Sequence, residues 1–293
     1  MQATIALIKR EYLEHRGAFV YGPLILLAVM LAAAIYAVLD IDFGGEFTES
    51  LPTVLRFYET GFAMSAAGWL VYLIIMLFFY YADAFAADSR NNSMLFWKSM
   101  PQSDLKILSS KVAASVTVFP ALILLALALT GVIVYLPTVM ASDFLGGFAP
   151  PSLGETAGAW LNVMVSALVI FVIALLWYLP FLAWVGLLGT MVKKWAIPLA
   201  FLIPAVIGLF ERVVTRNFLV DGVFWTFIAD RFELKFEGLD FEGYWLTGQP
   251  WNGLELAALM LNGTDWVQLV GGVAVAVIFV YFASEYRRRF VLA

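Results

Sequence analysis

The chain has 293 residues, of which 63% are hydrophobic and 13% are charged, and its formal net charge is −5. That much apolar surface cannot be hidden in a water-soluble core, so the composition excludes an ordinary soluble domain and predicts that lipid is the solvent. The chain contains no cysteine, which excludes disulfide bonds and thiolate chemistry.

The chain opens with an amphipathic stretch, residues 1–17. Ile5, Ile8 and Tyr12 share one helical stripe beside charged neighbours, which predicts a helix that lies at the membrane interface. This helix either anchors the first span or forms half of a docking platform for a soluble partner. His15 is the single histidine, and Glu11 and Glu14 do not make a convincing metal site with it.

Six apolar stretches are long enough to cross a hydrocarbon layer of about 30 Å at a helical rise of about 1.5 Å per residue. The sequence therefore predicts an all-α integral membrane protein, a single transmembrane domain (1–293) with six transmembrane helices. Prolines inside the third, fourth and fifth stretches predict kinks or interruptions. The predicted spans are residues 18–39, 65–87, 112–136, 160–192, 195–214 and 266–284.

Residues 88–111 form a charged connection between the second and third spans. Within it, Met94, Phe96, Trp97 and Met100 share one apolar helical face, and Lys98 is polar. Such a helix either rests on the membrane surface or docks a soluble subunit. A second helix is predicted to start at Ser103, with Asp104 favourable in its first turn.

Polar residues are rare within the predicted spans, and Asp83 is the main exception. It lies near the end of the second span, roughly one turn from Asp88, with Arg90 close by in the sequence. Asp83 is a candidate proton or ion carrier. The alternative is a structural or coupling role, in which it caps a helix or pairs with a nearby lysine or arginine.

Residues 215–265 form a long segment before the last span, and it mixes many aromatic residues with acids. Tryptophan and tyrosine favour the boundary between lipid and water. The composition predicts a structured exterior segment of short helices and turns, which serves either as an aromatic belt or as a surface for substrate exit or a partner.

The basic residues are distributed unequally between the two sides of the membrane. With six crossings, one side holds both termini, residues 88–111 and Lys193-Lys194, and it collects 12 of the 17 basic residues. The positive-inside rule makes that side cytoplasmic. Its charge sums to +6 and that of the exterior to −11. Such a basic rim favours contact with the anionic lipid of a bilayer, and nothing in the sequence supports nucleic-acid binding.

Sequence motifs of catalysis are absent. The chain lacks a Walker A sequence (Gly-x-x-x-x-Gly-Lys-Ser/Thr), a His-Glu-x-x-His pair and a Gly-x-Ser-x-Gly elbow, so neither a phosphate-binding loop nor a hydrolase site is predicted. The chain is not expected to be an enzyme by itself.

The order of several short features resembles the permease subunit of type-2 ABC exporters. These features are the opening residues 9–16, Asp83, Asp88 with Arg90, the apolar run 94–97, Pro101-Gln102-Ser103 and Lys111. Together with the six spans and the large last exterior segment, they cover nearly the whole chain. Asn91-Asn92-Ser93 stands where many members carry Gly-Thr.

The resemblance implies a multi-pass protein of a bacterial-type cytoplasmic (inner) membrane that moves a substrate out of the cytoplasm. The partners it implies are two copies of a soluble ABC ATPase subunit and a second permease chain, in a homodimer or heterodimer. ATP and Mg²⁺ would be bound by the ATPase, and this chain would bind no cofactor. The implied ATPase-docking residues are Met94, Phe96, Trp97, Lys98, Met100, Arg10 and Glu14, and the implied coupling residues are Asp83, Asp88 and Arg90.

Two other functions remain open on the sequence alone. The first is an ion-coupled secondary transporter that uses Asp83, and the second is a membrane scaffold that transports nothing.

Overall fold

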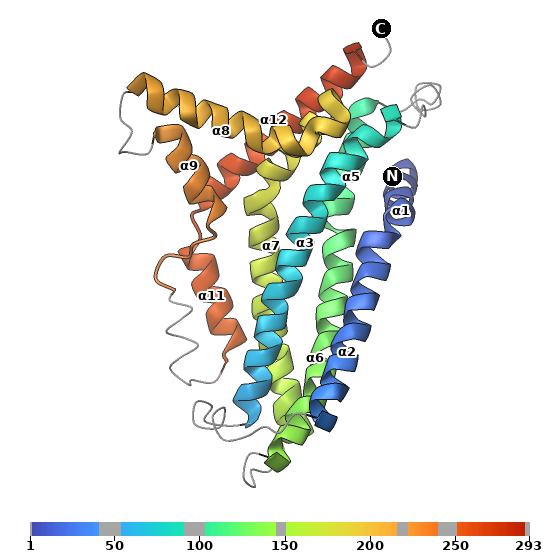
Figure 1. The fold of residues 1–293 in the computed structure, drawn as a ribbon, viewed down its shortest axis with the longest axis vertical. Coiled ribbons are helices and arrows are strands. Elements are labelled where there is room, and N and C mark those ends of the chain that lie inside the picture. Colours follow the sequence, from blue (N-terminus) through green and yellow to red (C-terminus); the bar gives the residue numbers. More distant parts are fainter. Residues whose placement is uncertain are drawn as a thin grey trace.

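The fold is a bundle of long helices. The computed structural model describes residues 2–40, 54–90, 103–144, 151–215, 222–239 and 251–290, and these ranges contain helices and no strand. The long helices α2, α3, α6 and α7 run roughly along the longest axis of the molecule, and the two chain ends lie at the same end of the bundle (Figure 1). The predicted all-α class is confirmed.

The helices follow one another in this order. The first half of the chain forms α1 (Gln2–Glu14), the π-helix η1 (Gly17–Tyr21), α2 (Gly22–Asp40), α3 (Val54–Arg90), α5 (Asp104–Val116) and α6 (Val118–Phe144). The second half forms α7 (Leu153–Val192), the 3₁₀ turn η2 (Lys193–Trp195), α8 (Ala196–Thr215), α9 (Val223–Phe232), α11 (Gly253–Gly263) and α12 (Trp266–Phe290).

By length and composition, the described residues contain five segments able to cross a membrane. They are Gly17–Tyr36, Val54–Ala87, Asp104–Val139, Leu153–Val214 and Trp266–Phe290. The chain is therefore a plausible multi-pass membrane protein. The fourth segment contains both the fourth and the fifth predicted spans, and the six-span layout stays a prediction.

The predicted fifth span, residues 195–214, forms α8, but α8 runs across the end of the bundle instead of alongside α7 (Figure 1). The direction changes at Lys193, whose φ of 52° is the one positive value of a non-glycine residue in the described ranges. Ala196 and Ala200 of α8 then pack against Ala82 of α3 and Leu188 of α7. The start of α8 therefore lies level with the last turns of α3 before Arg90.

Helix α7 is the centre of the bundle, and it packs against α3 and α12 along much of its length. Glycines allow the closest approach to α3. A Cβ at Gly189 would stand 2.8 Å from the carbonyl oxygen of Ala82, so only glycine fits there. Small residues bring helix backbones together in the same way in other membrane bundles.

The helices in the first half of the chain are interrupted at two places, after Val116 and between α1 and α2. Helices α5 and α6 are separated at Thr117, because Pro120 cannot donate to the carbonyl of Val116 and its ring crowds that position. The predicted effect of this proline is confirmed. Between α1 and α2, the π-helix leaves a carbonyl at Ala18 that accepts a hydrogen bond from the Tyr72 hydroxyl (2.6 Å).

After α8 the chain descends along α7. Arg231 of α9 contacts Trp177, and Trp251 and Gly253 at the start of α11 contact Ser166 and Asn162. Leu188, at the level of α8, and Asn162 are separated by about 39 Å at 1.5 Å per residue. The described contacts of α8, α9 and α11 with α7 are therefore spread over more than the thickness of a hydrocarbon layer of about 30 Å.

Candidate functional site

Helix α5 joins three parts of the chain at the end of the bundle where both termini lie. We call its ion-pair residues and their partners the α5 cluster: Glu11, Tyr80, Asp104, Lys111 and Arg287. They come from α1, α3, α5 and α12, so three helices that are distant in sequence meet around the short helix α5.

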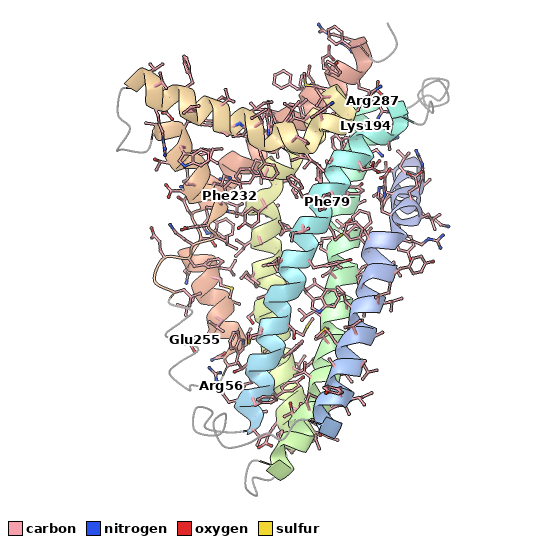
Figure 2. All side chains as sticks on the ribbon, in the orientation of Figure 1. Arg56, Phe79, Lys194, Phe232, Glu255 and Arg287 are labelled. Carbon is pink, nitrogen blue, oxygen red and sulfur yellow. The ribbon has the colours of Figure 1, made fainter. Side chains whose placement is uncertain are left out.

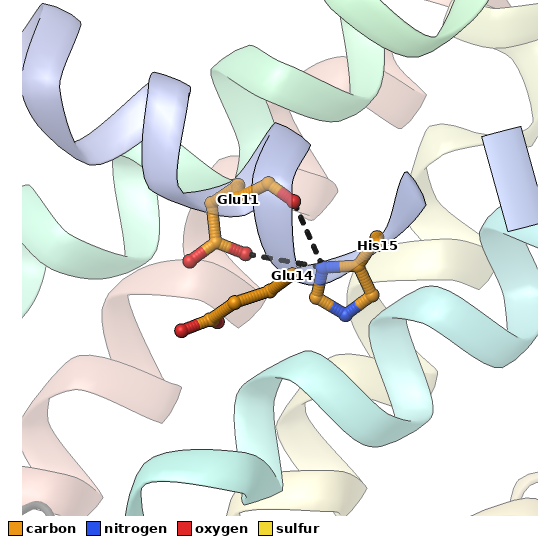
Figure 3. A group of neighbouring side chains, drawn as sticks. All are labelled: Glu11, Glu14 and His15. Carbon is orange, nitrogen blue, oxygen red and sulfur yellow. Dashed lines mark hydrogen bonds and ion pairs between the residues drawn. The ribbon is translucent and has the colours of Figure 1, made fainter. Parts of the chain in front are cut away.

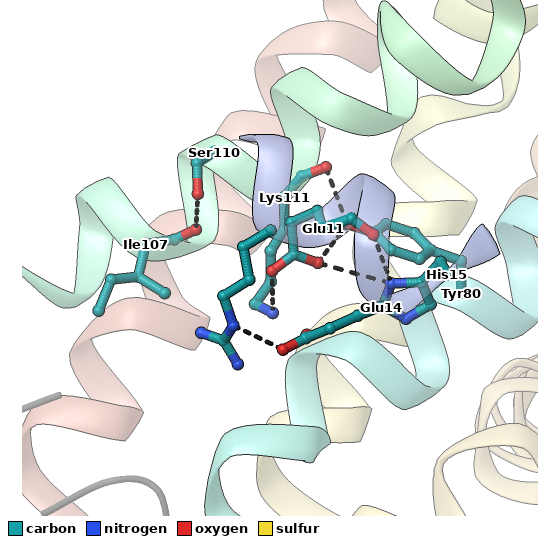
Figure 4. A network of polar contacts seen from close by, with 8 residues as sticks. Glu11, Glu14, His15, Tyr80, Ile107, Ser110 and Lys111 are labelled. Carbon is teal, nitrogen blue, oxygen red and sulfur yellow. Dashed lines mark hydrogen bonds and ion pairs between the residues drawn. The ribbon is translucent and has the colours of Figure 1, made fainter. Parts of the chain in front are cut away.

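The first ion pair of the α5 cluster joins α5 to α1. Lys111 Nζ donates to Glu11 Oε1 at 2.8 Å, and the two side chains are 1% and 3% exposed. Tyr80 donates its hydroxyl hydrogen to Glu11 Oε2 at 3.1 Å, and the carbonyl oxygen of Lys111 lies 3.2 Å from the same hydroxyl (Figure 4). Charges this deeply buried are tolerated only when paired, so α1 and α5 hold one another in register.

The second ion pair joins α5 to the end of α12. Arg287 Nε donates to Asp104 Oδ1 at 2.8 Å, and the Arg287 side chain is only 2% exposed. Ser103 caps the start of α5 by accepting a hydrogen bond from the backbone N–H of Lys106. The predicted helix start is confirmed, but the pairing of Asp104 with an arginine 183 residues away has no signal in the local sequence.

Aromatic rings fill the space beside the Glu11–Lys111 pair. The rings of Phe19 and Phe119 stack at 3.9 Å, and the ring of Tyr80 meets Phe119 edge-on at 5.0 Å. His15 approaches Tyr80 at 4.7 Å, also edge-on. This packing excludes water from the ion pair, which makes its electrostatic interaction stronger than it would be at a surface.

Glu11, Glu14 and His15 also bring potential metal-ligand atoms within 4.8 Å of one another (Figure 3). The cluster does not suit a metal ion, because the Lys111 ammonium already binds the Glu11 carboxylate. Glu14 is in turn paired with Arg10 at 2.6 Å. The three side chains therefore form part of an ion-pair network whose cations are protein side chains.

The predicted docking residues are only partly within the described chain. Arg10 and Glu14 form an i,i+4 ion pair on the partly exposed side of α1. Residues 91–102, with Met94, Phe96, Trp97, Lys98 and Met100, lie outside the described residues. The same holds for the side chains of Asp88 and Arg90, although both belong to α3.

Asp83 lies apart from the α5 cluster, on an exposed face of α3. It lines a cavity of about 300 Å³, together with Lys193, Lys194 and apolar side chains of α3 and α8. The sequence singled out Asp83, but nothing in it indicated that the Lys193-Lys194 turn, more than 100 residues later, would lie beside it.

At the other end of the bundle, polar contacts fasten α11 to α3 and α7. Glu59 is paired with Arg56 at 3.2 Å, and both are almost fully buried. The backbone N–H of Trp251 points to Glu59 Oε2 at 3.4 Å, and the Trp251 indole donates to the Ser166 hydroxyl at 3.1 Å. Trp251 is therefore a packing residue that fastens the start of α11 to the bundle.

Arg231 fastens the end of α9 against α7 and α12. Its guanidinium donates to the carbonyls of Gln268 (2.8 Å) and Trp177 (3.2 Å), and it lies 4.8 Å from the centre of the Trp177 ring. A cation here has to be matched by carbonyl and aromatic partners.

Comparison of the chain with family models, with curated proteins and with solved structures finds no match in any of the three.

Proposed function

We propose that this chain is the transmembrane permease subunit of an ATP-driven exporter of the type-2 ABC class. The observation that supports this proposal best is the position of α5. It begins within the predicted loop 88–111, after the apolar docking residues 94–100, and ion pairs bind it to α1 at Lys111 and to α12 at Asp104.

This arrangement is suited to transmitting a movement of the loop. A displacement of the loop reaches α5 at Asp104, where Arg287 is bound. Because breaking the buried Lys111–Glu11 pair would cost about 3–5 kcal/mol, and Arg287 is buried against Asp104, α5 would move together with α1 and the end of α12. The interruption at Thr117 lets this unit turn relative to α6.

In this proposal the chain crosses a bacterial-type cytoplasmic membrane six times, with both termini in the cytoplasm. The chain ends lie together (Figure 1), as an even number of crossings requires, and the contacts of Arg231 and Gly253 at different levels of α7 support a fifth crossing between α8 and α11. Two permease chains would assemble with two copies of a soluble ATPase, which binds ATP and Mg²⁺.

Co-purification tests the docking step. The chain is expressed with a candidate soluble ABC ATPase subunit, and the ATPase retained on the tagged permease is measured. Phe96→Asp or Trp97→Asp is expected to abolish retention, because a carboxylate at an apolar contact has to be desolvated without a partner. Phe290→Asp is the matched control, since Phe290 is an exposed aromatic residue outside the loop at the end of α12.

Equal retention of the ATPase by the loop variants and the control would refute the docking role of the loop. A complex that forms but shows neither transport nor substrate-stimulated ATP hydrolysis would favour the scaffold alternative.

An ion-coupled transporter is the second candidate, and the position of Asp83 beside a cavity favours it. It predicts that an imposed ion gradient drives transport of substrate by the chain alone in proteoliposomes, and that Asp83→Asn abolishes this transport. Transport that requires ATP and the ATPase, and that survives Asp83→Asn, would exclude it.

A further inference from the structure

The connection between α9 and α11 carries charges beside the middle of the bundle. Residues 233–239 follow α9 and form no helix, and we call them the 233–239 segment. Glu233 and Lys235 pair with one another, and their side chains are 63% and 68% exposed. Glu237 is exposed as well, so every ionisable residue of the segment lies at the protein surface.

Helix α9 fixes the level at which the segment begins. The carbonyl of Phe232, the last residue of α9, accepts a hydrogen bond from the Tyr178 hydroxyl of α7 (2.8 Å). Figure 2 shows Phe232 between Lys194, near one end of the bundle, and Glu255 of α11. The segment therefore starts beside the middle part of α7.

Helix α3 relates this level to the opposite side of the bundle. It runs in the same direction as α7 (Figure 1), and Ala82 of α3 lies against Gly189 of α7. Tyr178 lies eleven residues before Gly189 and Tyr72 lies ten before Ala82, so the two tyrosines are at about the same level. The Tyr72 hydroxyl donates to the carbonyl of Ala18 (2.6 Å), just before α2. The segment and the start of α2 therefore lie at one level, on opposite sides of the bundle.

Lipid has to cover α2 from this level onward. The candidate span Gly17–Tyr36 has a mean hydropathy of 2.4, and Ile25 within it is 63% exposed. Apolar surface of this kind and length calls for hydrocarbon as its solvent. From Ile25 the span continues to Tyr36 for about 17 Å, toward the end of the bundle opposite the chain ends (Figure 1).

Hydrocarbon cannot be the solvent of the 233–239 segment at the same level. Ionised side chains inside a bilayer face protein or water, and irregular backbone at this depth is not exposed to lipid. The N–H of Glu237 donates to the carbonyl of Gly263 (2.9 Å), but the N–H of Lys235 has no partner among the described residues. The side chains and the backbone of the segment therefore both require water.

The neighbouring helices indicate the side from which water comes. Toward the chain ends, the segment is preceded by α9, which exposes Trp225 and Phe227 and suits lipid. In the other direction, α11 exposes Asn252, Glu255 and Asn262 between its leucines. Polar surface thus continues from the segment along α11, away from the chain ends.

We propose that water reaches the 233–239 segment along α11, from the membrane side opposite the chain ends, while lipid covers α2 at the same level. The boundary between water and hydrocarbon then lies at different levels on the two sides of the bundle. A bilayer accommodates such a difference by local thinning or by a tilt of the protein. This inference rests on the membrane location of the chain and not on the exporter function.

Labelling of single cysteines in the full-length chain, which has none of its own, tests this boundary. Lys235→Cys and Ile25→Cys are compared in sealed vesicles that enclose the chain ends, with a membrane-impermeant maleimide added outside. Lys235→Cys is expected to react about tenfold faster or more than Ile25→Cys, because apolar surroundings hold a thiol in its unreactive neutral form. Labelling after addition of detergent gives the total for each variant.

Ile25→Cys is the matched control, because Ile25 and Lys235 are similarly exposed and lie at nearly the same level. Equally slow reaction of both variants would show that the segment is sealed from water. Equally fast reaction would show that lipid does not cover α2 at this level. Reaction of Lys235→Cys only from the side of the chain ends would place the water on the wrong side, and each of these three results refutes the proposal.

A nitroxide spin label on the same two cysteines separates hydration from thiol reactivity. At Lys235→Cys the label should collide more often with a water-soluble nickel chelate than with oxygen. At Ile25→Cys the order should be reversed, because oxygen concentrates in hydrocarbon and the chelate does not enter it. The same order of collision rates at both positions would contradict the proposal.

Discussion

Lys111 illustrates how much a single buried charge can determine. Lys111→Met would leave the buried Glu11 carboxylate without its lysine, with Tyr80 and His15 as its other described partners, and we expect it to lower the free energy of unfolding by about 3–5 kcal/mol. Adding Glu11→Gln should recover part of this loss, since the double variant has no unpaired charge. Thermal unfolding in detergent, followed by tryptophan fluorescence, measures both.

The exposed Arg10–Glu14 pair is the control for Lys111. Arg10→Gln with Glu14→Gln should change the free energy of unfolding by less than about 1 kcal/mol, as is usual for surface ion pairs. A Lys111→Met protein as stable as this control would show that the buried pair does not hold α1 on α5.

Asp104 and Arg287 allow a test by exchange of charges. Either Asp104→Arg or Arg287→Asp alone places two like charges at the 2.8 Å contact, and we expect a clear loss of stability and of ATPase coupling. The double exchange restores opposite charges, and it should recover at least part of both. The exposed Arg288–Glu285 pair is the control, exchanged in the same way by Arg288→Glu with Glu285→Arg. If the double exchange at Asp104 and Arg287 recovers no more stability, relative to its single variants, than this control does, the pairing is not specific.

At the scale of elements, α9 is positioned by one arginine and one glycine. A Cβ at Gly272 would stand 1.7 Å from Arg231 Nη2, whereas a Cβ at the adjacent Gly271 would meet nothing within 4 Å. Gly272→Ala should therefore displace Arg231 from its carbonyl partners and cost about 1–3 kcal/mol of stability. Gly271→Ala should be nearly neutral or slightly stabilising, and equal effects of the two substitutions would refute this account.

The elements themselves were largely predictable, because long apolar runs and helix-start signals are local. The stretches 65–87 and 266–284 fall within candidate spans of the structure, 18–39 overlaps the candidate span Gly17–Tyr36, and the helix after Ser103 begins where its N-cap predicts. The pairs that organise these helices were not predictable. Arg287 looked like one of three equivalent basic residues in the sequence, yet its side chain is buried and those of Arg288 and Arg289 are exposed.

At the scale of the whole molecule, the orientation of α8 is the main difference from the sequence prediction. Length and hydropathy cannot separate a helix that crosses a bilayer from one that lies along it. The contacts that turn α8 across the bundle are tertiary, as between Phe201 and Phe78, whose rings lie 5.6 Å apart. The candidate site shows the same limit, since its partners lie about 100 and 183 residues apart.

Single cysteines can establish the orientation of α8, because the chain has none of its own. Lys194→Cys and Val214→Cys mark the two ends of α8, and Leu153→Cys marks the opposite end of α7. With a membrane-impermeant maleimide added to sealed vesicles, the first two are expected to react from the same side and the third from the other. Reaction of Val214→Cys together with Leu153→Cys would instead make α8 the fifth crossing.

The gap in the helix at Thr117 also affects how strain would spread through the bundle. Since α5 and α6 have separate ladders of backbone hydrogen bonds, α5 can swivel without opening any hydrogen bond of α6. The break at Thr117 thus uncouples α5 from α6. A displacement of the loop is passed to α1 and α12, while the backbone hydrogen bonds of α6 stay intact. Helices α1 and α12, though farthest apart in sequence, would then be the first to move with α5.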